Sequence, residues 1–283
     1  MLIARRRTAS ARIYPTPTSG TACVTPTPDG TGYIIHPSVV DMGPQEWNGF
    51  RWWRLDTPYA NQSGAEENPC IYGSNDRINW EVPAGLTNPI DPWPGPAAGL
   101  LTLANSDVEL LWDPDGQRMV AYWREGGGKL YAESSYDGIT WLPHGIRSGI
   151  INNRSPGIAR GPDGQWRMLT FGPEMYVAPH ILGPWTAAAT PVGMSVPGRG
   201  APYHGDLIHH AGRWLAIFST TGTRDAWPAI SDDGTTWRVG SALPFGSYRP
   251  TMCPAPEAGY MDVWASDPSR YYRVPMSAWL DIP

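Results

Sequence analysis

The chain has 283 residues, of which 17% are charged and 41% hydrophobic, and its formal net charge is −5. Glycine (32) and proline (31) are too frequent for long helices, and the absence of a long apolar run excludes a membrane-spanning helix. The acidic balance argues against a nucleic-acid-binding surface. Trp (15) and Tyr (13) are abundant, and their combination of an apolar face with a polar group suits sheet packing and sugar stacking.

Residues 1–32 differ in composition from the rest of the chain. The first residues, MLIARRR, place charges directly after a short apolar start, which is not the pattern of a secretory signal peptide. Beyond them, alternating proline and threonine favour extended backbone without a core of its own. The sequence therefore predicts an extended N-terminal arm that docks either on a partner or on the edge of its own fold.

A unit of a short apolar run, a turn with glycine and a second apolar strand recurs five times after residue 33. The turn glycines are Gly49, Gly116, Gly164, Gly212 and Gly259, and the last four are 48, 48 and 47 residues apart. A second strand–turn unit follows each of these and ends in Trp80, Trp141, Trp185, Trp237 and Trp279. Two hairpins in a repeat of this length are typical of a propeller blade.

The predicted fold class is therefore all-β: a five-bladed β-propeller of four-stranded antiparallel blades with an extended N-terminal arm. The propeller is expected over residues 33–283, with blades at approximately 33–83, 106–145, 154–191, 203–241 and 249–283 and an inserted surface loop at 84–105. In the turns that contain Asp137 and Asp233, the aspartate is expected to accept backbone N–H groups, which is a structural role.

Cys23, Cys70 and Cys253 support neither a disulfide framework nor a zinc site, because their number is odd and no Cys-x-x-Cys pair occurs. We interpret them as small, semi-buried side chains. No cofactor is expected. His36 and His204 are candidate metal ligands, but no ligand spacing supports a site, so no metal is predicted.

Polar residues stand just before the first apolar run of every repeat. The innermost strand of each propeller blade lines the central channel, so these positions converge on one axis. Convergent polar groups beside aromatic side chains indicate a sugar site, unless they only bond one another or water. The expected substrate-binding residues are His36, Ser38, Trp53, Tyr59, Glu109, Arg154, Tyr203, His204 and Arg249.

Residues 33–283 resemble the five-bladed propeller glycoside hydrolases, the superfamily of family 43, family 32 and their relatives. The resemblance is carried by His36-Pro37, the segment from Trp52 to Tyr59, Glu67-Asn68-Pro69 and the segment from Trp80 to Pro89. The chain is similar to family-43-like proteins that occur in bacteria and are encoded by bacteriophage tail genes. The resemblance implies that two carboxylates with separated pKa values cleave a polysaccharide, one as base or nucleophile and one as acid.

The family's catalytic pattern is incomplete in this chain. Ser38 follows the His-Pro motif that would carry the first aspartate, and a serine does not replace a carboxylate as a general base. Asp107 matches the aspartate of the second blade, and Asp206 is retained in the fourth. The third blade has Arg154 where the family would have the glutamate that acts as general acid.

Three functions remain open from the sequence. The favoured one is a carbohydrate-binding virion component of a phage tail or head, made in the host cytoplasm, that recognises a host glycan and contacts other virion proteins through residues 1–32. An alternative is an active glycoside hydrolase that uses Asp206 and Glu67 as its catalytic pair, with Asp107 tuning them. A third is a purely structural virion protein with a filled channel. A cytoplasmic location is the alternative to the virion, and no nucleic-acid or membrane partner is expected.

Overall fold

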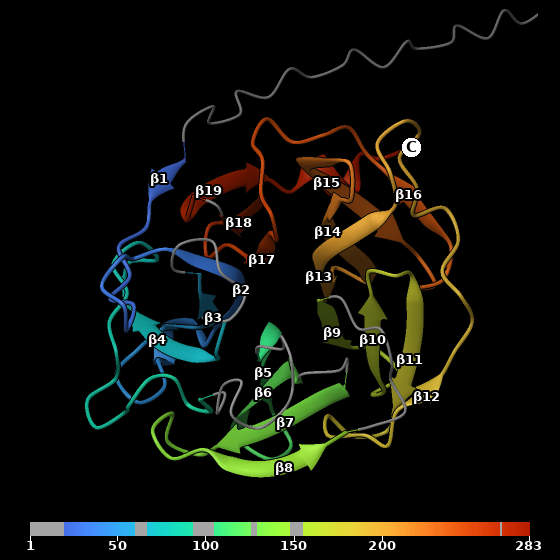
Figure 1. The fold of residues 1–283 in the computed structure, drawn as a ribbon. Helices are drawn as coiled ribbons and strands as arrows, with labels where there is room; N and C mark the ends of the chain where they lie inside the picture. The colour runs from blue at the N-terminus through green and yellow to red at the C-terminus, as the bar shows by residue number, and fades with distance from the viewer. Residues whose placement is uncertain (1–19, 60–66, 93–104, 126–128, 148–154, 267) are drawn as a thin grey trace, which may run out of the picture.

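A computed structural model describes residues 20–59, 67–92, 105–125, 129–147, 155–266 and 268–283. Within these ranges, nineteen strands form five antiparallel sheets around a central axis (Figure 1). The predicted five-bladed β-propeller is therefore confirmed. The described helices are η1 (Gly43–Gln45), a single 3-10 turn, and α1 (Ser277–Leu280). Neither has the length and apolar character needed to cross a membrane.

The first strand of each blade lies nearest the axis, and the later strands lie progressively outward (Figure 1). Blade one contains β2 (Ile34–Asp41), β3 (Trp52–Pro58) and β4 (Cys70–Ser74), and a single bridge between Gly73 and Glu81 stands in the fourth position. Blade two contains β5 (Ser106–Asp113), β6 (Arg118–Glu125), β7 (Lys129–Ser135) and β8 (Leu142–Ile146). Blade three contains β9 (Pro156–Arg160), β10 (Trp166–Thr170), β11 (Glu174–Ala178) and β12 (Thr186–Ala187). Blade four contains β13 (Pro202–His210), β14 (Arg213–Thr220), β15 (Thr223–Ser231) and β16 (Trp237–Val239).

Blade five takes its outermost strand from the other end of the chain. Its inner strands are β17 (Thr251–Pro254), β18 (Tyr260–Ala265) and β19 (Arg270–Pro275), and β1 (Thr21–Ala22) pairs with β19 at the rim. The chain then runs on to blade one, where the N–H of Val24 donates to the carbonyl of Ile78 and the N–H of Trp80 donates to the carbonyl of Val24, each at 2.9 Å. Residues 20–25 therefore join the last blade to the first.

The N-terminal segment is expected to dock either on a partner or on the edge of its own fold, and its described part does the second. Residues 20–32 dock on the protein's own fold, so the expected boundary at residue 32 does not separate an arm from the propeller. The attachment is strengthened by Arg54, which is fully buried in blade one and donates to the hydroxyl of Thr25 at 2.6 Å. Residues 1–19 lie outside the described part of the chain.

The apolar core lies between adjacent blades. The junction of blades five and one contains Trp80 and Trp264, with ring centroids 6.3 Å apart. Cys70 and Cys253 belong to this cluster and Cys23 packs against it, all three as free thiols. Four of the five expected blade tryptophans are buried: Trp80, Trp185, Trp237 and Trp279. The tryptophans thus fill the space between sheets, as the repeats predict.

The aspartate turns have the structural role that the sequence indicates. Asp137 Oδ1 accepts the backbone N–H groups of Ile139 at 2.8 Å and Thr140 at 2.7 Å. Asp233 makes the equivalent bonds in blade four, and these N–H donors lower its pKa to about 2. Asp76 forms the same turn in blade one.

Of the predicted loop at 84–105, residues 84–92 and 105 are described. Both ends of the Asn88 amide bond the backbone of Ile71 in β4, at 2.9 and 2.8 Å, and the N–H of Ile90 donates to the carbonyl of Pro69 at 2.9 Å. The start of the insertion therefore packs along blade one. Residues 93–104 lie outside the described residues.

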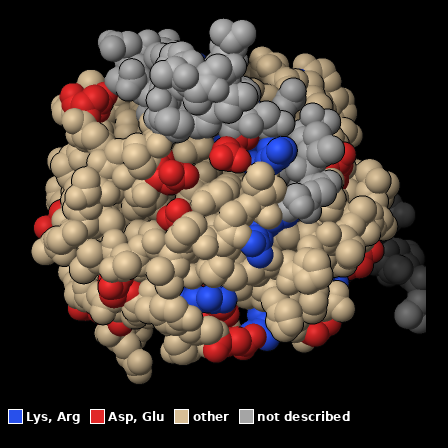
Figure 2. Space-filling view, turned by 60° about the horizontal axis from the view of Figure 1, so that its bottom comes forward, with Lys and Arg blue, Asp and Glu red and all other residues tan. Residues whose placement is uncertain are grey.

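Charged side chains on the outer surface are mixed in sign. On the face in Figure 2, arginines and acidic residues lie close together among uncharged side chains. The described ion pairs include Arg160 with Asp115 at 3.0 Å and Arg213 with Asp232 at 3.3 Å. Such exposed or half-exposed pairs contribute little to stability.

Deleting residues 1–26 should lower the free energy of unfolding by roughly 2–4 kcal/mol, because it removes β1, the backbone bonds of Val24 and the acceptor of Arg54. Chemical denaturation followed by tryptophan fluorescence measures the change. Deletion of residues 1–19 is the matched control and should leave stability unchanged. Equal stability of the two deletion variants would show that the closing segment does not hold the ring.

Candidate functional site

The innermost strands change register at one end of the channel. Strands β2, β5 and β13 each carry a β-bulge near their first residues. His36, Asp107 and Ser155, at equivalent positions in blades one, two and three, have positive φ angles of 53°, 55° and 45°. Non-glycine residues rarely adopt this conformation, and it is found where the surrounding structure enforces it, often at functional sites. The bulges in β2, β5 and β13 lie at His36, Asp107 and His204, and they re-aim these three side chains toward the axis.

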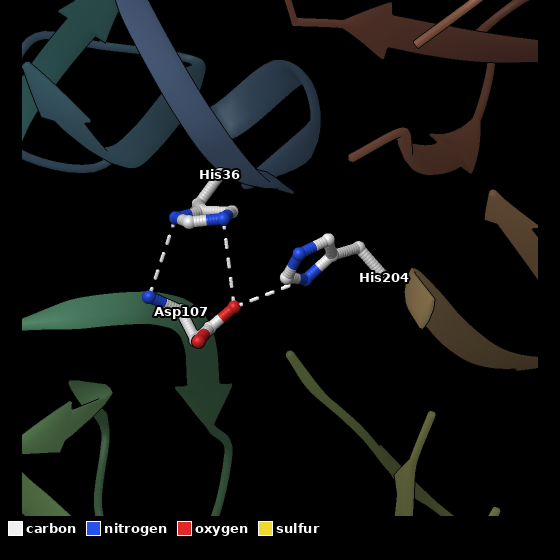
Figure 3. Close-up of side chains that lie close together, drawn as sticks. All are labelled: His36, Asp107 and His204. Carbon is white, nitrogen blue, oxygen red and sulfur yellow. Dashed lines mark hydrogen bonds and ion pairs between the residues drawn. The ribbon is translucent and has the colours of Figure 1, made fainter. Parts of the chain in front are cut away.

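His36, Asp107 and His204 meet at the axis from strands β2, β5 and β13 (Figure 3). Asp107 Oδ1 lies 3.5 Å from Nε2 of His36 and 3.1 Å from Nδ1 of His204. All three side chains are buried, and their potential ligand atoms lie within 4.8 Å of one another. The structure therefore places a compact set of nitrogen and oxygen ligands in the channel.

This set fits a divalent metal ion. Four ligands at about 2.1 Å from a tetrahedral zinc ion lie roughly 3.4 Å from one another. The two nitrogen–oxygen separations at Asp107 are close to that value. Nε2 of His36 is buried without a hydrogen-bond partner among the described residues, and a buried polar atom of this kind indicates a missing ligand. In His204 the orphaned nitrogen is Nε2, whereas Nδ1 is the nitrogen that faces Asp107. The sequence showed no ligand spacing because the three residues come from different blades.

Both oxygens of Asp107 are held by further side chains. Ser155 donates to Oδ1 at 2.9 Å and also contacts Nδ1 of His204. Arg124 places Nε 2.8 Å from Oδ2. Glu67 lies on the far side of His36, with Oε2 3.4 Å from Nδ1. These contacts orient the candidate ligands, as outer partners do in metal sites.

The charges at the site favour the protonation states that metal binding needs. Burial alone would raise the pKa of Asp107, but His36, His204 and Arg124 outweigh it and hold this pKa well below its usual range. Burial lowers the pKa of His204 to about 4, although Asp107 opposes that change. At neutral pH the carboxylate is therefore ionised and His204 is neutral, and both can act as ligands.

Tyrosine rings line the same mouth of the channel. The Tyr203 ring lies 3.9 Å from that of His204, and the Tyr248 ring lies 4.7 Å from that of His204. The Tyr248 hydroxyl donates to the Tyr203 hydroxyl at 3.5 Å. Burial raises the pKa of Tyr59, and the nearby Glu67 contributes to the same shift. Apolar ring faces with hydroxyl groups beside a polar cluster suit a sugar.

A second polar layer closes the channel beneath this cluster. Arg249 is fully buried and donates to Glu109 Oε2 at 2.7 Å and to the carbonyls of Gly205 at 3.2 Å and Pro156 at 3.4 Å. Ser38 donates to the same Glu109 oxygen at 3.1 Å. Arg249, Glu109 and Ser38, predicted to bind substrate, therefore bond one another and join the blades.

The two carboxylates expected as the catalytic pair of a glycoside hydrolase contact different groups of residues. Asp206 lies in the second layer, where Oδ2 accepts bonds from Thr251 at 2.7 Å and Met252 at 2.8 Å. Glu67 contacts His36 in the cluster above. The two carboxyls of a glycoside hydrolase must flank one glycosidic bond. The arrangement of Asp206 and Glu67 does not favour that reaction.

Trp53, also expected to bind substrate, is not part of the cluster. Trp53 is fully buried between blades one and two, where its indole N–H donates to the carbonyl of Trp47 at 3.1 Å. Arg154 lies outside the described residues. The sequence prediction did not select Ser155, Arg124 and Tyr248. Ser155 stands at the repeat position of His36 and was identifiable by that equivalence, whereas Arg124 sits at the far end of a second strand and had no sequence signal.

The apo protein should lose stability on acidification through His204. Unfolded histidine titrates near pH 6.5, so between about pH 6.5 and 4 the unfolded chain binds a proton that folded His204 does not. The stabilisation is complete above this window and falls within it, by about 3 kcal/mol in total. Urea unfolding in EDTA at several pH values should show this loss in the wild type and a smaller loss in His204→Gln. Identical pH dependence of the two proteins would contradict the burial of a neutral His204.

Comparison with known proteins finds similarity in sequence over part of the chain and in fold over most of it. No family model matches the chain. A segment of 115 residues is 35% identical to the A type blood N-acetyl-α-D-galactosamine deacetylase of Flavonifractor plautii, and the match covers 38% of this chain and 14% of that protein.

Solved structures show the same architecture. An N-acetylgalactosamine deacetylase from F. plautii in complex with blood group B trisaccharide has a TM-score of 0.71 at 20% identity and 94% coverage of both chains. An exo-β-1,3-galactanase from Phanerochaete chrysosporium has a TM-score of 0.60 at 11% identity, covering 91% of this chain and 63% of that one. A family 43 endo-arabinanase from Bacillus licheniformis has a TM-score of 0.56 at 12% identity, covering 87% and 96%. The resemblance to family 43 propellers is thus confirmed at the level of the fold.

Proposed function

We propose that the axial site is a metal-dependent centre that hydrolyses the acetamide of an N-acetylated sugar in a glycan. The observation that carries this proposal is the buried set of His36, Asp107 and His204, whose separations suit a divalent cation. The similarity to an N-acetylgalactosamine deacetylase supports the substrate class. A single cation can promote hydrolysis of an amide by polarising the acyl oxygen and activating a water molecule. Glycoside hydrolysis instead needs two carboxyls that flank the glycosidic bond.

A divalent ion bound here supplies a Lewis acid for the acyl oxygen and lowers the pKa of a water molecule. The protein's own groups prepare the site. Ser155 and Arg124 hold the two oxygens of Asp107, so the carboxylate keeps one orientation. Nδ1 of His36 accepts the backbone N–H of Asp107 at 3.3 Å and lies 3.4 Å from Oε2 of Glu67, and these contacts orient the ring so that Nε2 faces Asp107.

The tyrosines and the second layer shape the space around this reaction. Tyr203 and Tyr248 offer ring faces beside His204, on which a sugar ring packs. Arg249 closes the channel below, so the sugar approaches from the tyrosine side. Glycan binding, which the sequence predicts, is part of this proposal.

The virion role stays a prediction. Residues 20–32 are engaged in closing the ring, which leaves residues 1–19 for contact with other virion proteins. We likewise propose, without a finding that tests it, that the protein is located in a phage tail or head.

The full chain, supplied with Zn²⁺, should release acetate from glycans that end in N-acetylgalactosamine. EDTA should abolish the release, and added Zn²⁺ should restore it. Asp107→Asn and His36→Gln should each reduce the rate at least about 1,000-fold, since the cation's stabilisation of developing charge is worth several kcal/mol. Acetate and free amine are quantified together.

His180→Gln is the matched control, because His180 is exposed and lies outside the cluster. Acetate release that resists EDTA and survives Asp107→Asn would contradict the proposal. Reducing-sugar release that is lost in a folded Asp206→Asn variant would favour the glycoside hydrolase instead.

A further inference from the structure

Arg124 occupies a distinctive position next to the candidate metal ligands. It lies near the end of β6, paired with Ser106 at the start of β5 and therefore at the same mouth of the channel as the cluster. Its Nη2 donates to Ser106 Oγ at 2.8 Å, and its Nε lies 2.8 Å from Asp107 Oδ2. The side chain is 36% exposed, whereas Asp107 is fully buried. A guanidinium thus connects the buried carboxylate to solvent at the mouth.

The described contacts leave this guanidinium with binding capacity. Arginine has five N–H donors in a planar fork, and the contacts with Asp107 and Ser106 involve Nε and Nη2. Arg249 shows the opposite case, because it is fully buried and bonds protein oxygens from several blades. Arg124 is therefore the arginine of the described channel that is suited to a ligand.

The chemistry of that ligand follows from the fork. Arginine binds carboxylates through two parallel N–H bonds and stabilises oxygen atoms that gain negative charge. Amide hydrolysis generates both kinds of oxygen at one place. Water adds to the acyl carbon and the acyl oxygen gains charge. The C–N bond then breaks while the two protons of that water pass to the nitrogen, so that a carboxylate and a protonated amine leave.

We propose that Arg124 forms an acyl subsite, which binds the acyl oxygen of the substrate during hydrolysis and then the released acetate. This inference rests on the proposed deacetylation and assigns one of its binding groups. Arg124 contacts Oδ2 of Asp107, and Oδ1 of the same carboxylate faces the two histidines. Metal ligand and acyl subsite are thus joined by one side chain.

A purely positioning role of Arg124 makes a different prediction. If it only orients Asp107, Arg124→Lys should keep acetate binding whenever metal affinity is kept, because lysine retains a positive charge for the ion pair. If the fork binds acetate, lysine should lose the bidentate contact even with the metal in place.

The test is titration of sodium acetate into the full-length protein, Zn²⁺-loaded and metal-free, followed by NMR of ¹³C-labelled acetate. At saturating Zn²⁺, so that any loss of metal affinity does not enter the comparison, we expect acetate affinity to fall at least about 10-fold in Arg124→Lys and Arg124→Gln, the size of one charge-assisted hydrogen bond. Arg213→Lys is the matched control, because Arg213 also pairs with an aspartate, Asp232, at 3.3 Å, but lies at the opposite end of its blade.

The outcomes separate the two proposals. Unchanged acetate affinity in both Arg124 variants, or no acetate binding to the wild type in either form, overturns the acyl subsite. If the protein deacetylates glycans but its acetate affinity does not depend on Arg124, the proposed function is supported and the acyl subsite is refuted. A third outcome is that acetate binding depends on Arg124 but the protein neither binds Zn²⁺ nor releases acetate from glycans. That result refutes the proposed function and shows that Arg124 belongs to an anion-binding site. In the active enzyme, Arg124→Lys should lower kcat more than it changes KM for the glycan.

Discussion

The structure at the axis depends on the burial of one negative charge, that of Asp107. A carboxylate without solvent costs several kcal/mol unless opposite charge and hydrogen bonds compensate. Here Arg124 holds one oxygen, while His36, His204 and Ser155 face the other. These four groups come from four blades, so the charge is fully compensated only when the ring is assembled. The same compensation creates the ligand set for a cation.

The fold provides this geometry by repetition with local exceptions. Five inner strands bring equivalent positions to one axis, and bulges at the mouth turn His36 and Asp107 inward. The next inward-facing positions, among them Glu109 and Asp206, form a closed layer with Arg249. One layer is saturated with protein partners and the other retains orphaned nitrogen atoms. This difference distinguishes the two layers, and the layer with orphaned nitrogen atoms is the one that we propose to bind the cation.

The sequence predicts the propeller well because its signals are local and repeated: turn glycines, aspartate turns and blade tryptophans each act within one hairpin. It also predicts that His36, Asp107 and His204 converge, since repeat equivalence needs no distances. It does not separate the two layers, so Arg249 and Glu109 could not be distinguished from His204 before the side-chain contacts were known. Ring closure by Thr21–Ala22 depends on a two-residue pairing with β19, which leaves no pattern in the sequence.

The central claim is that one divalent cation binds between His36, Asp107 and His204. Crystals of the full chain grown with Zn²⁺ and measured at the zinc absorption edge test it directly. The account predicts one strong anomalous peak on the axis, about 2.1 Å from Nε2 of His36 and from Oδ1 of Asp107. An axis without such a peak in Zn²⁺-grown crystals, with the three side chains still bonded to one another, would contradict it.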